Sequence, residues 1–226
     1  MLYAKKVVVW GDSVARGVIY DEKRNRYALA RTSAAGIVAE KLNIEIVNRA
    51  RMGFTIRDGV KTIEHDLFRG MTADAAIIEF GGNDCNFDWK AISEAPEGKH
   101  LPNTPADIYE EKLTDIIETV RDAGMRPILV TLPPISADRY FDFISRGGLS
   151  QENILRWLGD KNHIYRYHER YSGIISRIAA KYSCTLLDIR AAFLEIWNTD
   201  SLFCLDGIHP SEAGQKFIGE AILQSL

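Results

Sequence analysis

The chain has 226 residues, of which 46% are hydrophobic and 26% are charged, a length and composition typical of one folded domain and unlike those of a disordered segment. Its 28 basic and 31 acidic residues give a formal net charge of −3, so no excess of positive charge indicates a nucleic-acid-binding surface. The apolar run near the N-terminus is too short for a signal peptide, and no run approaches the roughly 18 apolar residues of a membrane span. We therefore expect a cytoplasmic protein without a membrane span.

Short apolar runs alternate with helical patterns along the chain. Nearly continuous apolar runs predict strands that are covered on both faces, at 6–10, 44–47, 75–80, 127–131 and 185–189. Apolar residues at helical spacing predict helices at 104–123, 163–182 and 211–225. For the first of these helices, Thr104 is expected as the N-cap, with Pro105 and Asp107 in the first turn.

Alternating strands and helices predict βαβ units, and hence a parallel sheet with helices on both faces. We expect a single domain over residues 1–226. Two connections, 85–104 and 133–162, are longer than such units need. Long connections in compact domains are often binding loops or lids, so these two segments are candidates for covering a site.

Four polar segments follow predicted strands or precede the last helix, at 11–13, 48–53, 81–84 and 206–209. Ligands of open α/β sheets bind beyond the carboxyl ends of the strands. The sequence therefore predicts that these segments meet at one end of the sheet and form a site there.

The residue types in these segments suit acyl transfer. Ser13 carries a hydroxyl that needs a base, His209 can be that base, and Asp206 lies three residues before it, where it can hold the imidazole. The reaction also needs donors for an oxyanion, which the side chain of Asn83 and the backbone N–H groups of Gly53 and Ser13 can supply. Neither a cofactor nor a metal ion is required.

Each segment taken alone has a simpler interpretation as turn chemistry. A Gly-Asp-Ser turn and an Asp-Gly dipeptide are common in loops, and Asn83 can satisfy loop backbone groups. Four such segments in one order are harder to explain by turns alone. Asp12 and Asp84 are expected to be structural, accepting hydrogen bonds from loop amides.

In these four segments the sequence resembles the SGNH hydrolases, also called GDSL-type esterases and lipases, a family named for Ser, Gly, Asn and His in successive blocks. The letters match Ser13 in GDS, Gly53 in NRARMGFT, Asn83 in GGND and His209 in DGIHP. The resemblance runs from about residue 6 to residue 225. One departure is Val14, where the short family name has Leu.

The resemblance implies a flavodoxin-like three-layer α/β/α sandwich and a serine acylhydrolase. It implies that Ser13 is the nucleophile, His209 the base and Asp206 its partner. It also implies an oxyanion hole formed by Ser13 N–H, Gly53 N–H and Asn83.

Two alternatives to a serine esterase remain. A metal-dependent phosphoesterase could use the oxygen and imidazole ligands of Asp12, Asn83, Asp84, Asp206 and His209, but such sites usually draw on several histidines. The remaining histidines lie in no matching block: His65, His100, His163 and His168. Of these, His163 and His168 lie in the aromatic stretch and are expected to pack or to face solvent. Cys85, Cys184 and Cys204 include no CxxC pair, which argues against a zinc site or a disulfide framework. The other alternative is a binding module that keeps the fold without chemistry.

The substrate is less well defined by the sequence. Aromatic residues in 140–171 either line the site, where they would suit sugar or aryl groups, or only pack: Tyr140, Phe141, Phe143, Trp157, Tyr165 and Tyr167. Arg49, Arg51 and Arg57 either meet an anionic substrate or form a solvated face. We expect a small or short-acyl ester, with an acetylated carbohydrate as one candidate and a lysophospholipase- or thioesterase-type activity as the alternative. The oligomeric state is not indicated.

Overall fold

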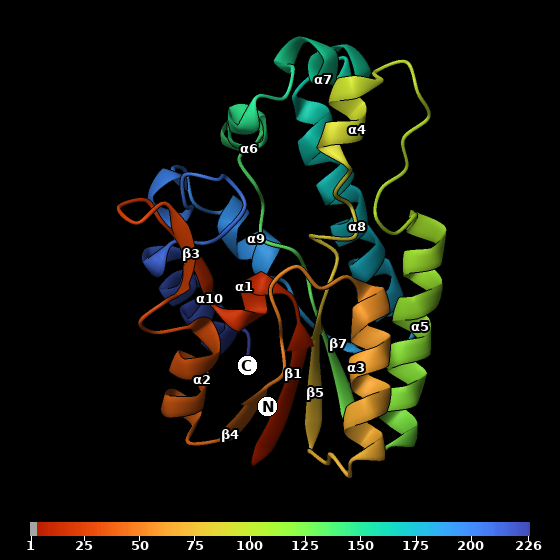
Figure 1. Cartoon of the computed structure of the whole chain (residues 1–226). Helices are drawn as coiled ribbons and strands as arrows, with labels where there is room; N and C mark the ends of the chain where they lie inside the picture. Colours follow the sequence, from red (N-terminus) through yellow and green to blue (C-terminus); the bar gives the residue numbers. More distant parts are fainter. Residues whose placement is uncertain (1–3) are drawn as a thin grey trace.

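The structure, a computed structural model, describes residues 4–226. At its centre lies a five-stranded parallel sheet with the strand order β4-β1-β5-β6-β7 (Figure 1). The strands are β1 (Lys6–Gly11), β4 (Glu45–Asn48), β5 (Ala75–Glu79), β6 (Arg126–Val130) and β7 (Thr185–Leu187). Counting only these strands, this is the flavodoxin-like order 2-1-3-4-5, in which ligands bind where the order reverses, beside β1. The predicted α/β sandwich with a five-stranded parallel sheet is confirmed.

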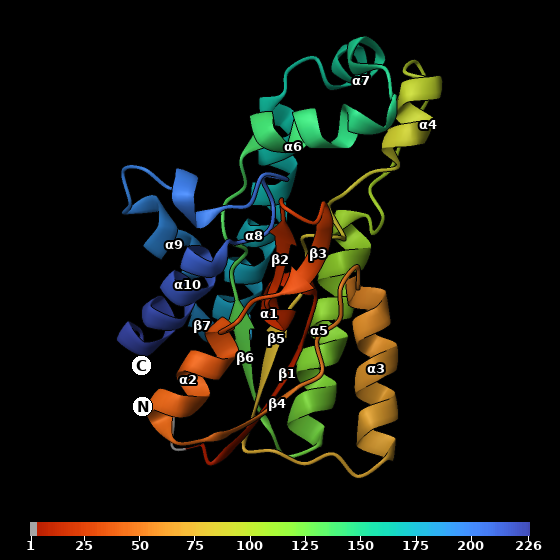
Figure 2. The same ribbon diagram turned by 60° about the vertical axis from the view of Figure 1, so that its left-hand side comes forward.

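Helices cover both faces of the sheet. One face packs against α3 (Ile56–Phe68), α5 (Ala106–Asp122) and α8 (Asn162–Lys181). The other packs against α2 (Ala34–Leu42), α9 (Ile189–Leu194) and α10 (Glu212–Gln224) (Figures 1 and 2). Successive strand residues point to opposite faces, so both faces of each central strand must be apolar, which explains the continuous apolar runs in the sequence.

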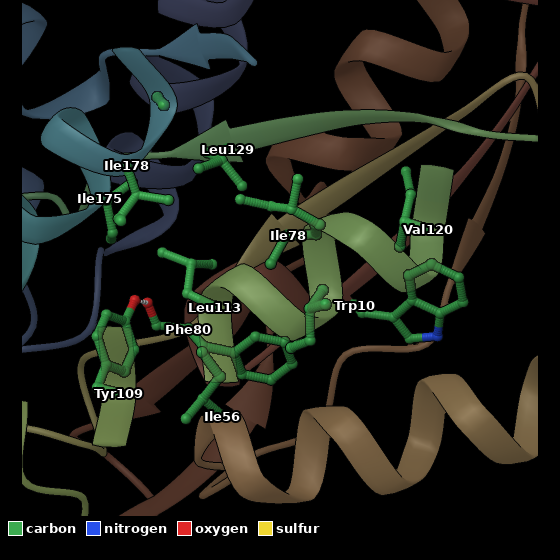
Figure 3. Packing of buried hydrophobic residues seen from close by; sticks show 14 of the residues in the cluster. Trp10, Ile56, Ile78, Phe80, Tyr109, Leu113, Val120, Leu129, Ile175 and Ile178 are labelled. Carbon is green, nitrogen blue, oxygen red and sulfur yellow. Dashed lines mark hydrogen bonds between the residues drawn. The ribbon is translucent and has the colours of Figure 1, made fainter. Parts of the chain in front are cut away.

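The larger core lies between the sheet and α3, α5 and α8. Figure 3 shows Trp10, Ile78 and Leu129 of the strands meeting side chains of the helices. Its polar atoms have partners: Tyr109 Oη donates to Phe80 O at 2.7 Å, and Trp10 Nε1 donates to Asp66 Oδ2 at 3.0 Å. Each fully buried large apolar side chain here contributes about 1.5–3 kcal/mol.

A cap of short helices lies over the carboxyl ends of the strands (Figures 1 and 2). It consists of α4 (Trp89–Glu94), α6 (Ala137–Ile144), η1 (Ser145–Gly147) and α7 (Gln151–Leu158). A separate apolar cluster that includes Phe87 and Ile154 holds it together. The predicted long connection 133–162 is therefore largely helical, whereas 85–104 contains only the short helix α4 (Trp89–Glu94), and both cover the end of the sheet where the polar segments lie.

Some local predictions were incomplete or wrong. The hairpin of β2 (Val18–Asp21) and β3 (Arg26–Leu29) was not predicted, because its half-exposed residues form no apolar run. Thr104 is not the N-cap of α5, which begins at Ala106 with Pro105 as the cap. Thr104 is buried and its N–H donates to Asp84 O at 3.0 Å, which keeps it in the preceding loop.

No helix within residues 4–226 is long and apolar enough to cross a membrane.

Candidate active site

Ser13 lies immediately beyond the end of β1, as the first residue of the short helix α1 (Ser13–Arg16). Asp12 caps this helix, its Oδ1 accepting the Val14 N–H at 2.8 Å. The neighbouring strand β5 passes so close that a Cβ at Gly11 would lie 2.7 Å from Glu79 O. Glycine at this position therefore lets the end of β1 lie close to β5, directly before the serine turn.

The structure brings Ser13, His209 and Asp206 together in one hydrogen-bonded line. The Ser13 hydroxyl lies 2.9 Å from His209 Nε2, and His209 Nδ1 lies 2.6 Å from Asp206 Oδ2. All three residues are buried. In this geometry His209 can take the serine proton on Nε2 while its Nδ1–H donates to the carboxylate, which is the arrangement of a serine nucleophile with its base.

Asp206 is held as an anion. Burial alone would raise the pKa of Asp206. The hydrogen bond and the charge of His209, together with hydrogen bonds from backbone N–H groups, outweigh burial, so the pKa of Asp206 lies below its ordinary value. Those backbone bonds run from Ile208 and His209 to Asp206 Oδ1, at 3.2 and 3.1 Å. The carboxylate thus fixes both the loop and the imidazole.

The loop that carries His209 is packed closely against the cap. A Cβ at Gly207 would lie 2.7 Å from Ser136 O, and Ser136 N–H donates to Gly207 O at 2.8 Å. Glycine is needed here because of this approach and because its φ is +76°. On the other side, the ring of Tyr27 from the hairpin lies 4.9 Å from the His209 ring, centroid to centroid.

The three predicted oxyanion donors, Ser13, Gly53 and Asn83, all line the same cavity. Asn83 Nδ2 donates to Phe54 O at 3.0 Å and to Asp12 Oδ2 at 3.3 Å. Gly53 has a φ of +80° in the loop after β4. The predicted site residues are therefore together at the carboxyl end of the sheet.

The expected structural roles of Asp12 and Asp84 are confirmed by their hydrogen bonds. Asp12 caps α1, as described above, and both carboxylate oxygens of Asp84 accept the N–H of Ile56, at 3.0 and 3.1 Å. Asp84 thereby anchors the start of α3. Burial raises the pKa of Asp84 to about 6, although the hydrogen bonds from the Ile56 N–H lower it.

Sequence reasoning missed Glu79, the last residue of β5. Its buried side chain lies under the Ser13 turn, where Oε2 accepts the N–H groups of Asp12 at 3.2 Å and Ala15 at 3.3 Å. Burial, followed by the negative charge of Asp12, raises the pKa of Glu79 well above its ordinary value. One acidic residue inside an apolar strand was the available signal. Tyr27 was also missed, and its half-exposed hairpin gave no signal.

Two cavities meet at Ser13. We call the first the inner cavity: it has a volume of about 70 Å³ and extends beneath the cap to Ile164 and His168. The outer cavity is wider, about 410 Å³, and lies beside Tyr27, Gly53 and the cap. Ser13, Asn83 and His209 line both cavities, so an ester placed at the serine can extend one part into each.

The aromatic candidates divide between the site and the scaffold. Tyr167 lines the inner cavity, Phe143 lines the outer one, and Tyr140 lines both. Trp157 packs on Phe87 within the cap, with ring centroids 4.9 Å apart.

The basic candidates lie outside both cavities. Arg49 pairs with Asp66, its terminal nitrogen 2.6 Å from the carboxylate, and Arg51 and Arg57 are exposed. None of the three arginines is among the residues that line the inner or the outer cavity.

The expectation that His163 and His168 pack or face solvent holds for His168 only in part. It is buried, but it lines the inner cavity. Among residues 4–226, no group of three or more His, Cys, Asp or Glu side chains is arranged to hold a metal ion.

A known protein family matches nearly the whole chain. The model of the GDSL-like lipase/acylhydrolase family matches residues 7–222. The chain belongs to this family. It is accordingly a carboxylic ester hydrolase of the GDSL (SGNH) type.

Individual relatives are distant in sequence. An acetylxylan esterase of Geobacillus stearothermophilus is 24% identical over 193 residues, covering 84% of this chain and 75% of the relative. A lipase/acylhydrolase from Enterococcus faecalis has a similar solved structure, with a TM-score of 0.68 at 21% identity over 97% of this chain and 94% of that one. A catalytic variant of an acetylxylan esterase from Geobacillus stearothermophilus gives 0.67 at 20% identity over 98% and 93%. At these identities, the structural similarities support the fold.

Proposed function

We propose that this GDSL hydrolase cleaves small or short-acyl esters, with Ser13 as the nucleophile, His209 as the base and Asp206 as its orienting carboxylate. The observation that carries the proposal is the line from Ser13 through His209 to Asp206, with distances of 2.9 and 2.6 Å, placed where a small cavity meets a larger one. A small cavity suits the acyl group, and the larger one suits the alcohol part of the ester.

The reaction follows from the geometry. His209 Nε2 takes the hydroxyl proton as Ser13 Oγ attacks the ester carbonyl carbon, and the carbonyl oxygen becomes an oxyanion near Asn83, Gly53 N–H and Ser13 N–H. The oxyanion collapses, the bond to the alcohol oxygen breaks, and His209 returns its proton to that oxygen. Water then attacks the acyl-enzyme with His209 again as base, which releases the acid and restores the serine.

Acetylated carbohydrates are the first substrate class to test. Two observations support this choice: a distant relative is an acetylxylan esterase, and the outer cavity is bordered by Tyr27, Tyr140 and Phe143, whose flat apolar faces, two of them with polar tips, suit sugar rings. The short inner cavity argues against long fatty-acyl chains, which would need a longer apolar groove.

The proposal is tested by hydrolysis of p-nitrophenyl acetate, butyrate and decanoate, and of acetylated xylo-oligosaccharides. We expect turnover of the short esters, loss of turnover in Ser13→Ala, and unchanged turnover in Ser225→Ala, an exposed serine near the C-terminus. A serine-directed phosphonate should form one adduct, on Ser13. Full activity in Ser13→Ala, or loss on chelation with recovery on adding manganese or zinc, would refute the serine mechanism.

A further inference from the structure

Buried nitrogen atoms without partners in the described part of the chain lie on His168, which lines the inner cavity, and on Arg190, which is bonded to the cavity residue Leu132. His168 on α8 is only 6% exposed, and its Nδ1 has no hydrogen-bond partner within the described chain. Arg190 on α9 is 7% exposed, and its Nε and one terminal nitrogen likewise lack partners among residues 4–226. Buried polar side chains are usually bonded, so this concentration of free nitrogen atoms needs a cause.

Arg190 carries a positive charge that acts on His168. One terminal nitrogen donates to Leu132 O at 3.0 Å, and the guanidinium lies over the ring of Tyr165 at 5.1 Å. No carboxylate among residues 4–226 forms an ion pair with it. Burial, and then the charge of Arg190, lowers the pKa of His168 to about 3. The His168 imidazole is therefore neutral near pH 7, while the Arg190 guanidinium that acts on it has no ion-pair partner among residues 4–226.

His168 and the candidate nucleophile line the same cavity. Around them the walls are mostly apolar, formed by residues that include Phe87, Leu132 and Ile164. A neutral imidazole always has one N–H donor, and the nearby cation makes this end of the cavity favourable for the negative end of a dipole or for an anion. A ligand atom that accepts a hydrogen bond fits this end better than a methyl group does.

We propose that the inner cavity binds a short acyl chain whose distal end carries a hydrogen-bond acceptor, a carbonyl or carboxylate oxygen, and that His168 donates to this acceptor with Arg190 supporting it electrostatically. The inference rests on the proposed ester hydrolysis and refines its substrate: it assigns His168 as the residue that selects the acyl group.

The size of the cavity sets the length of this acyl chain. About 10–15 Å³ of such volume holds one water-sized group, so about 70 Å³ accommodates roughly five to seven non-hydrogen atoms. An acetyl group fills only part of this space. Acyl groups of four or five carbons with an oxygen at the far end fill it and place the oxygen away from the ester carbonyl.

Three methyl esters of similar length separate the possibilities, with the acid released followed by titration. Methyl pentanoate has an apolar end, methyl 4-oxopentanoate has a neutral acceptor, and monomethyl succinate has a carboxylate. We expect kcat/KM for at least one of the two acceptor esters to exceed that for methyl pentanoate by about tenfold, the worth of one buried hydrogen bond.

Variants assign this preference to particular residues. His168→Leu should remove it, bringing the ratio of kcat/KM values close to one, while His168→Gln, which keeps a donor, should retain part of it. His65→Leu makes the same change at an exposed position on α3 that lines neither cavity, and it should leave the ratio unchanged. Arg190→Gln removes the positive charge. It should therefore lower kcat/KM for monomethyl succinate, whose distal end is charged, more than for methyl 4-oxopentanoate, whose distal end is neutral.

The ratio of kcat/KM values for two esters, measured on one preparation, does not change when part of the protein in that preparation is unfolded. A wild-type enzyme that prefers methyl pentanoate over both acceptor esters overturns the inference, as does a preference that His168→Leu leaves intact. If the enzyme hydrolyses neither these esters nor p-nitrophenyl acetate, the proposed function itself fails. If it hydrolyses methyl pentanoate but does not prefer the acceptor esters, only the role of His168 is rejected.

Discussion

The side-chain amide of Asn83 is held between two oxygen atoms, Phe54 O at 3.0 Å and Asp12 Oδ2 at 3.3 Å. These contacts use both hydrogens of the amide. The contact with Asp12 is the longer one, so it is the one that an oxyanion forming on the substrate would compete for. Its neighbours therefore fix the position of Asn83 in the absence of substrate, and in the proposed oxyanion role one of its N–H groups would leave Asp12 for the oxyanion.

Replacing Asn83 by alanine is expected to lower kcat and kcat/KM together, with little change in KM, because the amide acts mainly in the transition state. Loss of one such donor typically costs about 10²–10³-fold in rate. Steady-state kinetics and thermal melting on the same preparation test this expectation. Near-normal kcat with a clearly lower Tm would instead assign Asn83 a purely structural role.

Asn83→Asp is a sharper companion to the alanine variant. It keeps the size of the side chain but places a carboxylate against Phe54 O and Asp12 Oδ2, both of which need a donor. We expect activity at or below that of Asn83→Ala. Higher activity in the aspartate variant than in the alanine variant would contradict the oxyanion assignment.

Asp206→Asn tests the orientation of the imidazole. An amide cannot serve as the anionic acceptor for His209 Nδ1–H, now 2.6 Å from Asp206 Oδ2, so the ring is expected to present the wrong tautomer to Ser13. We expect kcat to fall on the order of 10⁴-fold, as for this change in other serine triads, with the fold kept. Circular dichroism controls for folding, and kcat within about tenfold of wild type would remove Asp206 from the triad.

The sheet and the polar segments at its end could be predicted because each depends on local sequence. Buried parallel strands are apolar on both faces, and segment 81–84 follows such a strand directly. The cap and the hairpin could not be predicted, because their helices and strands are short and are stabilised by tertiary contacts such as Ser150 N–H to Ser93 Oγ at 2.7 Å. Propensity decides little in elements of that length.

The two cavities and their lining could not be predicted for a different reason. His168 lies in the same helix as several residues of the core, at ordinary helical spacing. Whether that position faces the core or a cavity depends on how the cap sits above α8, which no local pattern encodes. Glu79 is intermediate: an acid inside an apolar strand is visible in the sequence, but its contacts with Asp12 and Ala15 are not.

Glu79 is expected to position the Ser13 turn without taking part in the chemistry. Its Oε2 accepts the N–H groups of Asp12 and Ala15, and its raised pKa favours the protonated form. Glu79→Gln mimics that form and should keep kcat within several-fold of wild type. Glu79→Leu removes the side-chain acceptor of the Ala15 N–H, at a cost of about 1–3 kcal/mol, while the Asp12 N–H keeps its bond to Glu79 O at 3.1 Å; this variant should lower both Tm and kcat.

The comparison of these two variants decides the role of Glu79. The glutamine variant should have nearly the kcat and KM of the wild type even if its Tm is slightly lower. Equal damage in both variants would mean that the carboxylate charge, and not the hydrogen-bonding shape, is needed. Wild-type kcat in the leucine variant would show that the turn holds Ser13 without this support.

Asp84 is expected to make stability depend on pH. Its pKa is raised mainly by burial, from 3.8 to about 6, so the folded state binds this proton more tightly than the unfolded state. The contribution of the protonated group is therefore fully present below about pH 4 and is lost as pH rises through about 6, amounting to roughly 3 kcal/mol.

The variant Asp84→Asn measures this contribution, because its amide cannot ionise and still offers an oxygen to the Ile56 N–H. The free energy of unfolding of this variant, minus that of wild type, should rise by roughly 2–2.5 kcal/mol between about pH 4 and 7. Denaturant titrations at several pH values give the difference, which cancels the titration of groups common to both proteins. Asp122→Asn, at an exposed position at the end of α5, is the matched control and should show a difference that stays nearly constant. A constant difference for Asp84→Asn as well would mean that Asp84 has the same proton affinity in the folded and unfolded chains.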